Sequence, residues 1–194
     1  MTCGNAASTR QMARISRDDP FYYLTSVAHD RLPIFRHEEI KDIVCGAWNE
    51  ARKSGEILIF AYVIMPDHVH MITDGGRKIS DVLRFTNGIS AKRILDHLKS
   101  GPYESSLRKL RQETKEKGHK YSGWQHNPDA FRITGEDALW QKVNYIHQNP
   151  VRAGLVARAE EYRYSSVRLW RGGVLEDEPF MTDHKLIDWR STAA

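Results

Sequence analysis

The spacing of hydrophobic positions changes several times along the chain, and each spacing predicts one kind of element. Aromatic and β-branched residues are concentrated at 21–27 and predict a first strand. From His37 to Lys53, apolar residues recur at helical spacing and predict an amphipathic helix. An apolar run from Ile57 to Met65 is broken at Pro66-Asp67 and followed by His68–Thr73, which predicts an antiparallel hairpin. The first half therefore has the order strand, helix, strand, strand.

The second half continues with two more helices and one more strand. Ser80 is a candidate cap for a helix whose apolar positions run to Leu98. Residues 103–123 are basic and polar and predict a loop, and Ala130–Ile133 predicts a short strand. A last helix follows, and we expect Pro150 to end it, because proline lacks the N–H that a helix needs.

This order predicts an α+β fold of the ferredoxin-like type, with helices packed on one face of an antiparallel sheet. Residues 1–19 are polar, small and charged, and predict a flexible N-terminal tail. We expect the domain to occupy residues 20–170. A C-terminal extension, 171–194, would be anchored to it by Phe180 and Trp189.

Composition narrows the class of protein without deciding its function. The chain has 194 residues, of which 40% are hydrophobic and 28% charged, as in a globular domain. Its formal net charge is +4. Between Arg77 and Lys120 there are twelve basic residues against five acidic ones. Such a stretch suits the phosphates of a nucleic acid, although a solvated helix and a mobile basic loop explain it equally well.

Cysteine content and hydropathy point to a protein that is not exported. Cys3 and Cys45 are too few and too far apart for a disulfide framework or a cysteine metal site. The longest apolar run, Ile57 to Met65, is much shorter than the ~20 residues of a membrane-spanning helix. We therefore expect a cytoplasmic protein that does not enter a membrane.

The predicted strand that begins at His68 carries a histidine pair. Side chains alternate across a strand, so His68 and His70 lie on the same face, with Cα atoms ~6.6 Å apart. Neutral imidazole binds several transition metals. The pair suits a shared metal ion, and two histidines that simply face solvent are the alternative.

The last predicted helix places two polar side chains beside its apolar stripe. Leu139, Val143 and Ile146 form the stripe, and Tyr145 and Asn149 share a neighbouring face because they are four residues apart. A phenol can act as a nucleophile, and an amide oxygen can complete the coordination of a metal. An ordinary core-edge tyrosine and a helix-ending asparagine remain the alternatives.

Two segments together carry a family resemblance. The first is Met65-Pro66-Asp67-His68-Val69-His70, and the second is the run from Val143 to Val156, VNYIHQNPVRAGLV. In order and spacing they resemble the HUH single-tyrosine transposases, particularly the REP-associated tyrosine transposases. The similarity extends from the strand at Phe21 to about Trp170 and includes Tyr164-Ser165-Ser166.

The resemblance implies a ferredoxin-like fold and a specific chemistry. His68 and His70 match two metal ligands, Asn149 matches the third, and Tyr145 matches the nucleophile. The divalent metal would be Mg²⁺ or Mn²⁺. Tyr145 would attack single-stranded DNA beside a hairpin, giving a free 3′-OH and a 5′-phosphotyrosine link. Two imidazoles and one amide oxygen form a neutral ligand set that leaves room for water and phosphate oxygens.

The implied partner is DNA with hairpins formed by repetitive palindromic elements, bound by a monomer or a homodimer. Basic residues of the central stretch, together with Arg152, are the candidate phosphate contacts. They are Lys92, Arg93, Arg108, Lys109, Arg111, Lys115, Lys117, Lys120 and Arg152. We expect His147 and Gln148 to face solvent or DNA, and Asp67 to serve the turn before His68 rather than to orient a ligand.

Two other functions compete with cleavage through a tyrosine. A domesticated nucleic-acid-binding regulator would keep the fold without cutting. A phosphodiesterase would attack with water and leave Tyr145 structural. The presence of His68, His70, Tyr145 and Asn149 together favours the transposase-like enzyme, because a protein that only binds has no physical need for all four.

Overall fold

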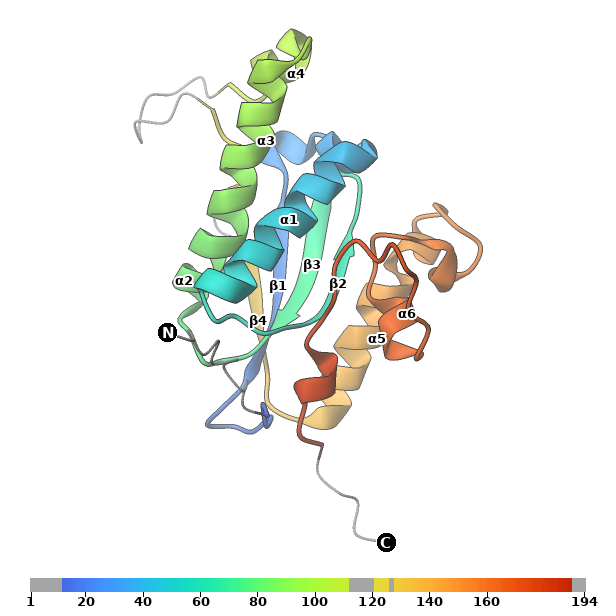
Figure 1. Ribbon diagram of the computed structural model, residues 1–194. Helices are drawn as coiled ribbons and strands as arrows, with labels where there is room; N and C mark the ends of the chain where they lie inside the picture. The colour runs from blue at the N-terminus through green and yellow to red at the C-terminus, as the bar shows by residue number, and fades with distance from the viewer. Residues whose placement is uncertain (1–11, 112–120, 126–127, 190–194) are drawn as a thin grey trace, which may run out of the picture.

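The computed structural model describes residues 12–111, 121–125 and 128–189 (Figure 1). Its strands are β1 (Phe21–Val27), β2 (Ile59–Ile64), β3 (His68–Thr73) and β4 (Asp129–Ile133). Its α-helices are α1 (Glu38–Ser54), α2 (Ile79–Leu83), α3 (Ile89–Ser100), α4 (Glu104–Lys109), α5 (Glu136–Arg152) and α6 (Val167–Trp170).

The four strands form one antiparallel sheet in the order β2-β3-β1-β4. This is the order expected of a ferredoxin-like unit, so the predicted α+β class is confirmed. Helices α1 and α3 pack against each other and cover the face of the sheet that is turned to the viewer in Figure 1.

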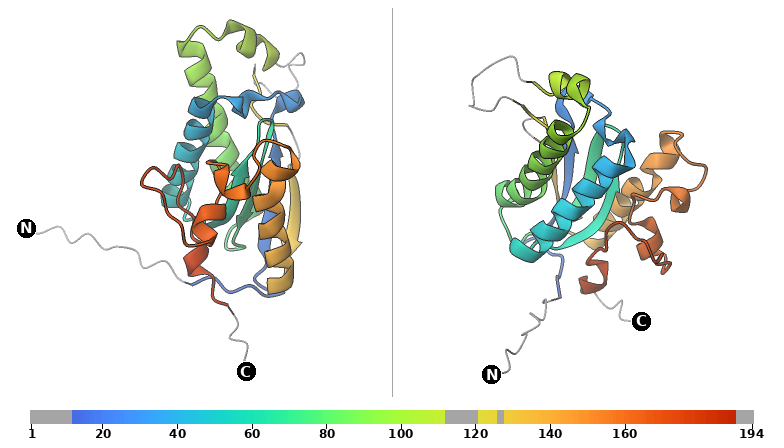
Figure 2. Two further views of the ribbon diagram at one scale, coloured as in Figure 1. Left: turned by 90° about the vertical axis from the view of Figure 1, so that its right-hand side faces the viewer. Right: turned by 45° about the horizontal axis from the view of Figure 1, so that its top comes forward.

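Helix α5 lies on the opposite face and is an addition to the expected arrangement of helices on one face. Tyr62 and Met71 are paired across β2 and β3, and the Tyr62 ring contacts Trp48 of α1. His70 precedes Met71 in β3 and therefore faces the other way, where its ring contacts Tyr145 of α5. The sheet thus has helices on both faces (Figure 2).

A three-ring cluster joins the sheet, α1 and the C-terminal extension. The rings of Trp48, Tyr62 and Phe180 lie 5.3–5.7 Å apart, edge to face. All three side chains are buried. The expected anchoring by Phe180 is confirmed, and the extension contributes to the hydrophobic core.

The segment before β1 also contacts the C-terminal extension. Ile15 is buried in the core, and Ala13 forms a parallel bridge with Ile187. The Ala13 N–H donates to Leu186 O at 2.7 Å. Residues 12–19 are therefore docked, and the expected tail does not include them; residues 1–11 lie outside the described residues.

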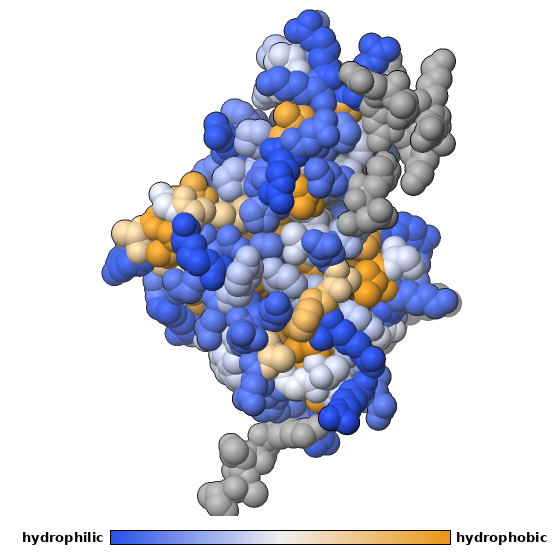
Figure 3. Space-filling model, turned by 180° about the vertical axis from the view of Figure 1, so that it is seen from behind, coloured by the Kyte–Doolittle hydropathy of each residue, from blue (hydrophilic) through white to orange (hydrophobic). Residues whose placement is uncertain are grey.

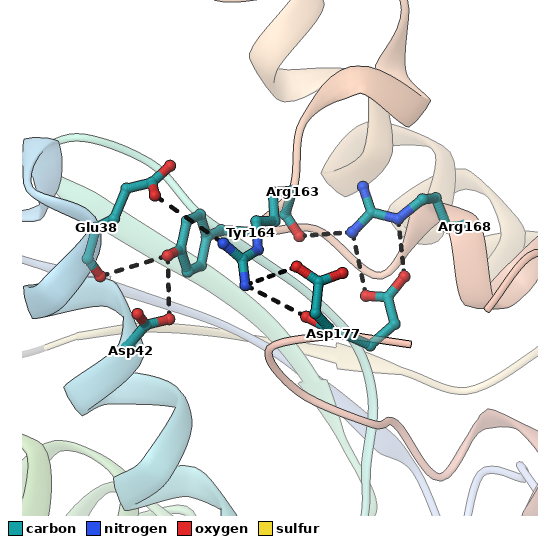
Figure 4. A network of polar contacts seen from close by, with 7 residues as sticks. Glu38, Asp42, Arg163, Tyr164, Arg168 and Asp177 are labelled. Carbon is teal, nitrogen blue, oxygen red and sulfur yellow. Dashed lines mark hydrogen bonds and ion pairs between the residues drawn. The ribbon is translucent and has the colours of Figure 1, made fainter. Parts of the chain in front are cut away.

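The segment 164–166 continues the sheet beyond β2. Ile64 N donates to Tyr164 O at 2.9 Å, and Ser166 N donates to Tyr62 O at 3.0 Å. The Tyr164 hydroxyl donates to Asp42 of α1 at 3.0 Å (Figure 4). The edge of β2 is therefore covered, and the chain that follows α5 is tied back to the sheet.

The second helical region differs from its prediction in three details. Lys78, not Ser80, occupies the N-cap of α2, and Ser80 lies within the helix. A π-helical turn at Arg84–Gly88 joins α2 to α3, so the helical region continues through Gly88. Part of the predicted loop at 103–123 forms α4. Among the helices described, none is long and apolar enough to cross a membrane.

Pro150 does not end the last long helix, as we expected it to. It lies in the final turn, where its missing N–H removes a single internal hydrogen bond, and it is buried. The helix continues to Arg152. The chain turns away at Gly154, whose φ of +68° is a left-handed conformation that glycine adopts without strain.

Candidate active site

His68 and His70 lie side by side on the α5 face of β3, as predicted from strand periodicity. Their ring centroids are 4.8 Å apart, with the ring planes at 70°. His70 is 5% exposed, and the His68 side chain is partly exposed at 19%. Two imidazoles at this separation can share one small ligand.

Asp67 orients His68 and does more than form a turn, contrary to our expectation. His68 Nδ1 donates to Asp67 Oδ1 at 2.6 Å, and Arg31 donates to Asp67 Oδ2 at 3.1 Å. Partial burial raises the pKa of Asp67, but the bonds from His68 and Arg31 outweigh it and hold that pKa below its usual value. With the proton held on Nδ1, Nε2 of His68 keeps its lone pair for a metal.

His70 is oriented by two hydroxyl groups of β1. Its Nδ1 lies 2.8 Å from the Tyr23 hydroxyl and 3.0 Å from Thr25 Oγ1. Burial is the main cause that lowers the pKa of His70 to about 3, with smaller contributions from the neighbouring side chains of His68, Arg152 and Lys142. His70 is therefore neutral at pH 7, the form that binds metal ions.

Tyr145 projects from α5 towards the two histidines. Its ring centroid lies 5.6 Å from that of His70 and 6.1 Å from that of Tyr23. The residue is nevertheless 43% exposed, so solvent reaches part of it. The Arg152 guanidinium lies 4.1 Å from the centre of the Tyr145 ring and donates to the Tyr145 carbonyl at 3.0 Å.

Asn149 follows Tyr145 by one helical turn, and its Nδ2 is buried without a hydrogen-bond partner among the residues that the structure describes. A half-turn of the amide brings its oxygen to this position, and an amide oxygen is a metal ligand that needs no proton removed. His68, His70 and Asn149 therefore fit a divalent cation by chemistry. No group of three His, Cys, Asp or Glu side chains in the described residues is arranged for a metal.

The predicted DNA contacts fall into separate places. Arg152 lies at Tyr145, whereas Lys92, Arg93, Arg108 and Lys109 belong to α3, which covers the other face of the sheet, and to α4, which packs against α3. Lys92 is paired with Asp96 and Arg93 with Glu50. Arg111 forms a backbone bridge with Tyr121. Lys115, Lys117 and Lys120 lie outside the described residues.

Three residues beside the site escaped the sequence analysis. Tyr23 and Thr25 belong to a strand that the pattern identified, but their contact with His70 depends on the pairing of β1 with β3. Lys142 lies on α5 three residues before Tyr145. Its helical spacing from Tyr145 was a signal that could have identified it.

His147 is a second buried histidine, although we expected it to face solvent or DNA. It is 6% exposed, and its Nε2 lies 3.0 Å from Ser166 Oγ. Burial, helped by the positive charges of Arg171 and His184, lowers its pKa to about 3. His147 thus joins α5 to the segment 164–166 in its neutral form.

Burial of His147 predicts a loss of stability in mild acid. Above the unfolded-state pKa of about 6.5, His147 is unprotonated in both the folded and the unfolded chain. Between about pH 6.5 and pH 3 only the unfolded chain binds it, so the free energy of unfolding falls as the pH falls. Urea denaturation with a chelator should show a steeper fall for wild type than for His147→Gln, by up to about 1.4 kcal/mol per pH unit between pH 6 and 4. Parallel curves would contradict this prediction.

Comparison with known proteins identifies the family of this chain. The model of the family described as "Transposase IS200 like" matches residues 20–149, which is more than half of the chain. The chain belongs to the IS200-like transposase family. The matched range runs from before β1 to Asn149 and includes His68, His70 and Tyr145.

Two solved structures are similar to this chain, and the first of them shares its fold. A REP-associated tyrosine transposase bound to a REP hairpin is 17% identical, with a TM-score of 0.57, over 90% of this chain and 91% of that one. A putative transposase from Deinococcus radiodurans is 20% identical with a TM-score of 0.39, over 68% of this chain and 90% of that one. Among curated proteins, none matches this chain with significance.

Proposed function

We propose that this transposase-family chain cleaves and rejoins single-stranded DNA beside hairpins, with Tyr145 as the nucleophile. The observation that carries the proposal is the convergence of His68, His70 and the exposed Tyr145 ring in one site. The family match and the hairpin bound to a structural relative support DNA as the partner.

Each side chain has a distinct part in the proposed reaction. The phenol oxygen of Tyr145 attacks the phosphorus, and the bond from phosphorus to the 3′ oxygen breaks. The phenol loses its proton and the leaving oxygen gains one, so a 3′-OH and a 5′-phosphotyrosine result. Arg152, which packs on the Tyr145 ring, orients the nucleophile and offers positive charge to the phosphate.

His68, His70 and Asn149 would hold Mg²⁺ or Mn²⁺. When bound, the cation would polarise the scissile phosphate and stabilise the charge that develops on it. Asp67 orients His68, and Tyr23 with Thr25 orients His70, so that each ring keeps one nitrogen free. Attack by the freed 3′-OH on the phosphotyrosine reverses the step without an energy cofactor.

The test is covalent trapping on a labelled oligonucleotide that carries a hairpin and single-stranded flanks. With Mn²⁺, wild type should give a labelled band that survives denaturing electrophoresis, and Tyr145→Phe should not. Equal cleavage by wild type and Tyr145→Phe would indicate attack by water. Hairpin binding without any cleavage would indicate a regulator.

A further inference from the structure

One stripe of α5 carries more than the nucleophile and the proposed ligand. Lys142, Tyr145, Asn149 and Arg152 are spaced by three, four and three residues, so they follow one face of the helix. Tyr145 contacts His70, which places this face above the histidine-bearing side of the sheet. Lys142 and Arg152 therefore flank Tyr145 along the helix with two positive charges.

Lys142 lies over two aromatic rings. Its Nζ is 4.4 Å from the centre of the Phe131 ring and 4.9 Å from that of Tyr23. These two aromatic residues are paired across β4 and β1. In the described part of the chain, Lys142 forms no ion pair with a carboxylate, so its charge remains available to a phosphate.

Phe131 is the exposed member of this group. It is 51% exposed on β4, an edge strand of the described sheet, whereas Tyr23 beneath Lys142 is 8% exposed. A large ring left open to solvent costs hydration free energy, and here it lies beside a cation. The face away from α1 and α3 is mostly hydrophilic, with hydrophobic residues in small groups (Figure 3). Such a face suits a charged partner better than an apolar one.

The group is continuous with the candidate active site. Tyr23, which Lys142 overlies, contacts the ring of Tyr145 at 6.1 Å and places its hydroxyl 2.8 Å from His70 Nδ1. An aromatic ring for a base and a cation for a phosphate are the two elements from which single-strand-binding surfaces are built. Both therefore occur next to the proposed nucleophile.

We propose that Phe131 and Lys142 form a binding position for one nucleotide of the single strand that reaches Tyr145. The base stacks on Phe131, and Lys142 pairs with the adjacent phosphate. This inference rests on the proposed function, because it assumes that single-stranded DNA is the substrate. In this inference, β4 holds the single-stranded DNA beside the hairpin while Tyr145 reacts.

The first experiment measures binding by fluorescence anisotropy in the presence of a chelator, so that no cleavage occurs. One probe is a labelled DNA hairpin with single-stranded flanks of about ten nucleotides of random sequence. The other is the same hairpin without flanks. Phe131→Ala should weaken binding of the flanked probe by about 5- to 100-fold, the loss expected for one stacked base, and leave the unflanked probe unchanged. Phe131→Trp should bind like wild type.

The second experiment separates the phosphate contact from the stacking contact by salt dependence. Loss of one phosphate contact to a single strand lowers the slope of log affinity against log salt by about 0.7. Lys142→Gln should show this change on the flanked probe, and Phe131→Ala should not. Lys99→Gln is the matched control, because Lys99 Nζ lies 5.6 Å from the centre of the Tyr121 ring, away from Tyr145. Val174→Ala, at a 56% exposed position, controls for Phe131.

Two results would overturn the inference. One is wild-type binding of the flanked probe by both Phe131→Ala and Lys142→Gln. The other is an equal loss on both probes, which would indicate a general effect on the fold. Neither result depends on the covalent band, so the inference can fail while Tyr145-dependent trapping succeeds, and the reverse also holds.

Discussion

Replacement of His70 by glutamine should abolish the covalent DNA product, whereas replacement of His147 by glutamine should not. Both histidines are buried, and burial lowers both pKa values to about 3. Of the two, only His70 contacts the rings of Tyr145 and His68. Loss of an outer partner of a ligand costs about 10- to 100-fold in metal affinity or activity, so loss of the ligand itself should exceed about 100-fold.

The measurement is the initial rate of covalent trapping with Mn²⁺ at pH 7.5, on samples whose circular dichroism shows a folded protein. His147→Gln serves as the matched control, because it removes a second buried imidazole, from α5, without replacing any of the proposed ligands. If both variants retained the wild-type rate, the assignment of His70 as a ligand would be wrong. If both lost it equally, burial of an imidazole would be the shared cause.

Glu178→Ala should cost about 3–5 kcal/mol of unfolding free energy, the effect of leaving one charge of a buried ion pair without its partner. Glu178 receives two bonds from Arg168, at 2.7 and 3.1 Å, and the two side chains are 2% and 10% exposed. Arg168 also donates to backbone carbonyls, among them that of Arg163 at 2.9 Å (Figure 4). The pair therefore fixes the loop after α6 to the segment 160–164.

Chemical denaturation at neutral pH measures this cost, and Asp96→Ala provides the comparison. Asp96 is paired with Lys92 on the surface of α3, where both side chains are more than half exposed. An exposed pair is worth about 0.2–1 kcal/mol. A loss for Glu178→Ala no larger than that for Asp96→Ala would contradict the prediction.

The hydrophobic pattern predicted best the elements in which buried and exposed positions follow a regular period. Strand β3 begins and ends where the pattern placed it, and α1 differs from its prediction by one residue at each end. The prediction that Pro150 ends the helix is wrong because a proline in the final turn removes only one hydrogen bond of the helix. Burial of its ring also favours continuation of the helix. Docking of residues 12–19 depends on single apolar residues such as Ile15, which carry no periodic signal.

In the candidate site, too, only some of the contacts could be predicted from the sequence. The common face of His68 and His70 follows from strand periodicity, and the structure places them as predicted. The proposed role of Tyr145 came from the resemblance to a family, since an exposed tyrosine on a helix has many explanations. The contribution of Tyr23 depends on which strands pair, and that of Phe131 on which strand is outermost. Neither can be read from local sequence.

The pairing of residues 164–166 with β2 restricts how copies of this protein can assemble. Helix α5 is joined to the sheet at its start through β4 and, after its end, through hydrogen bonds of Tyr164 and Ser166 to β2. Exchange of α5 between two copies would require both connections to open and the buried Tyr164 ring to be exposed. In this structure a single chain therefore supplies both Tyr145 and the His70 ring that it contacts.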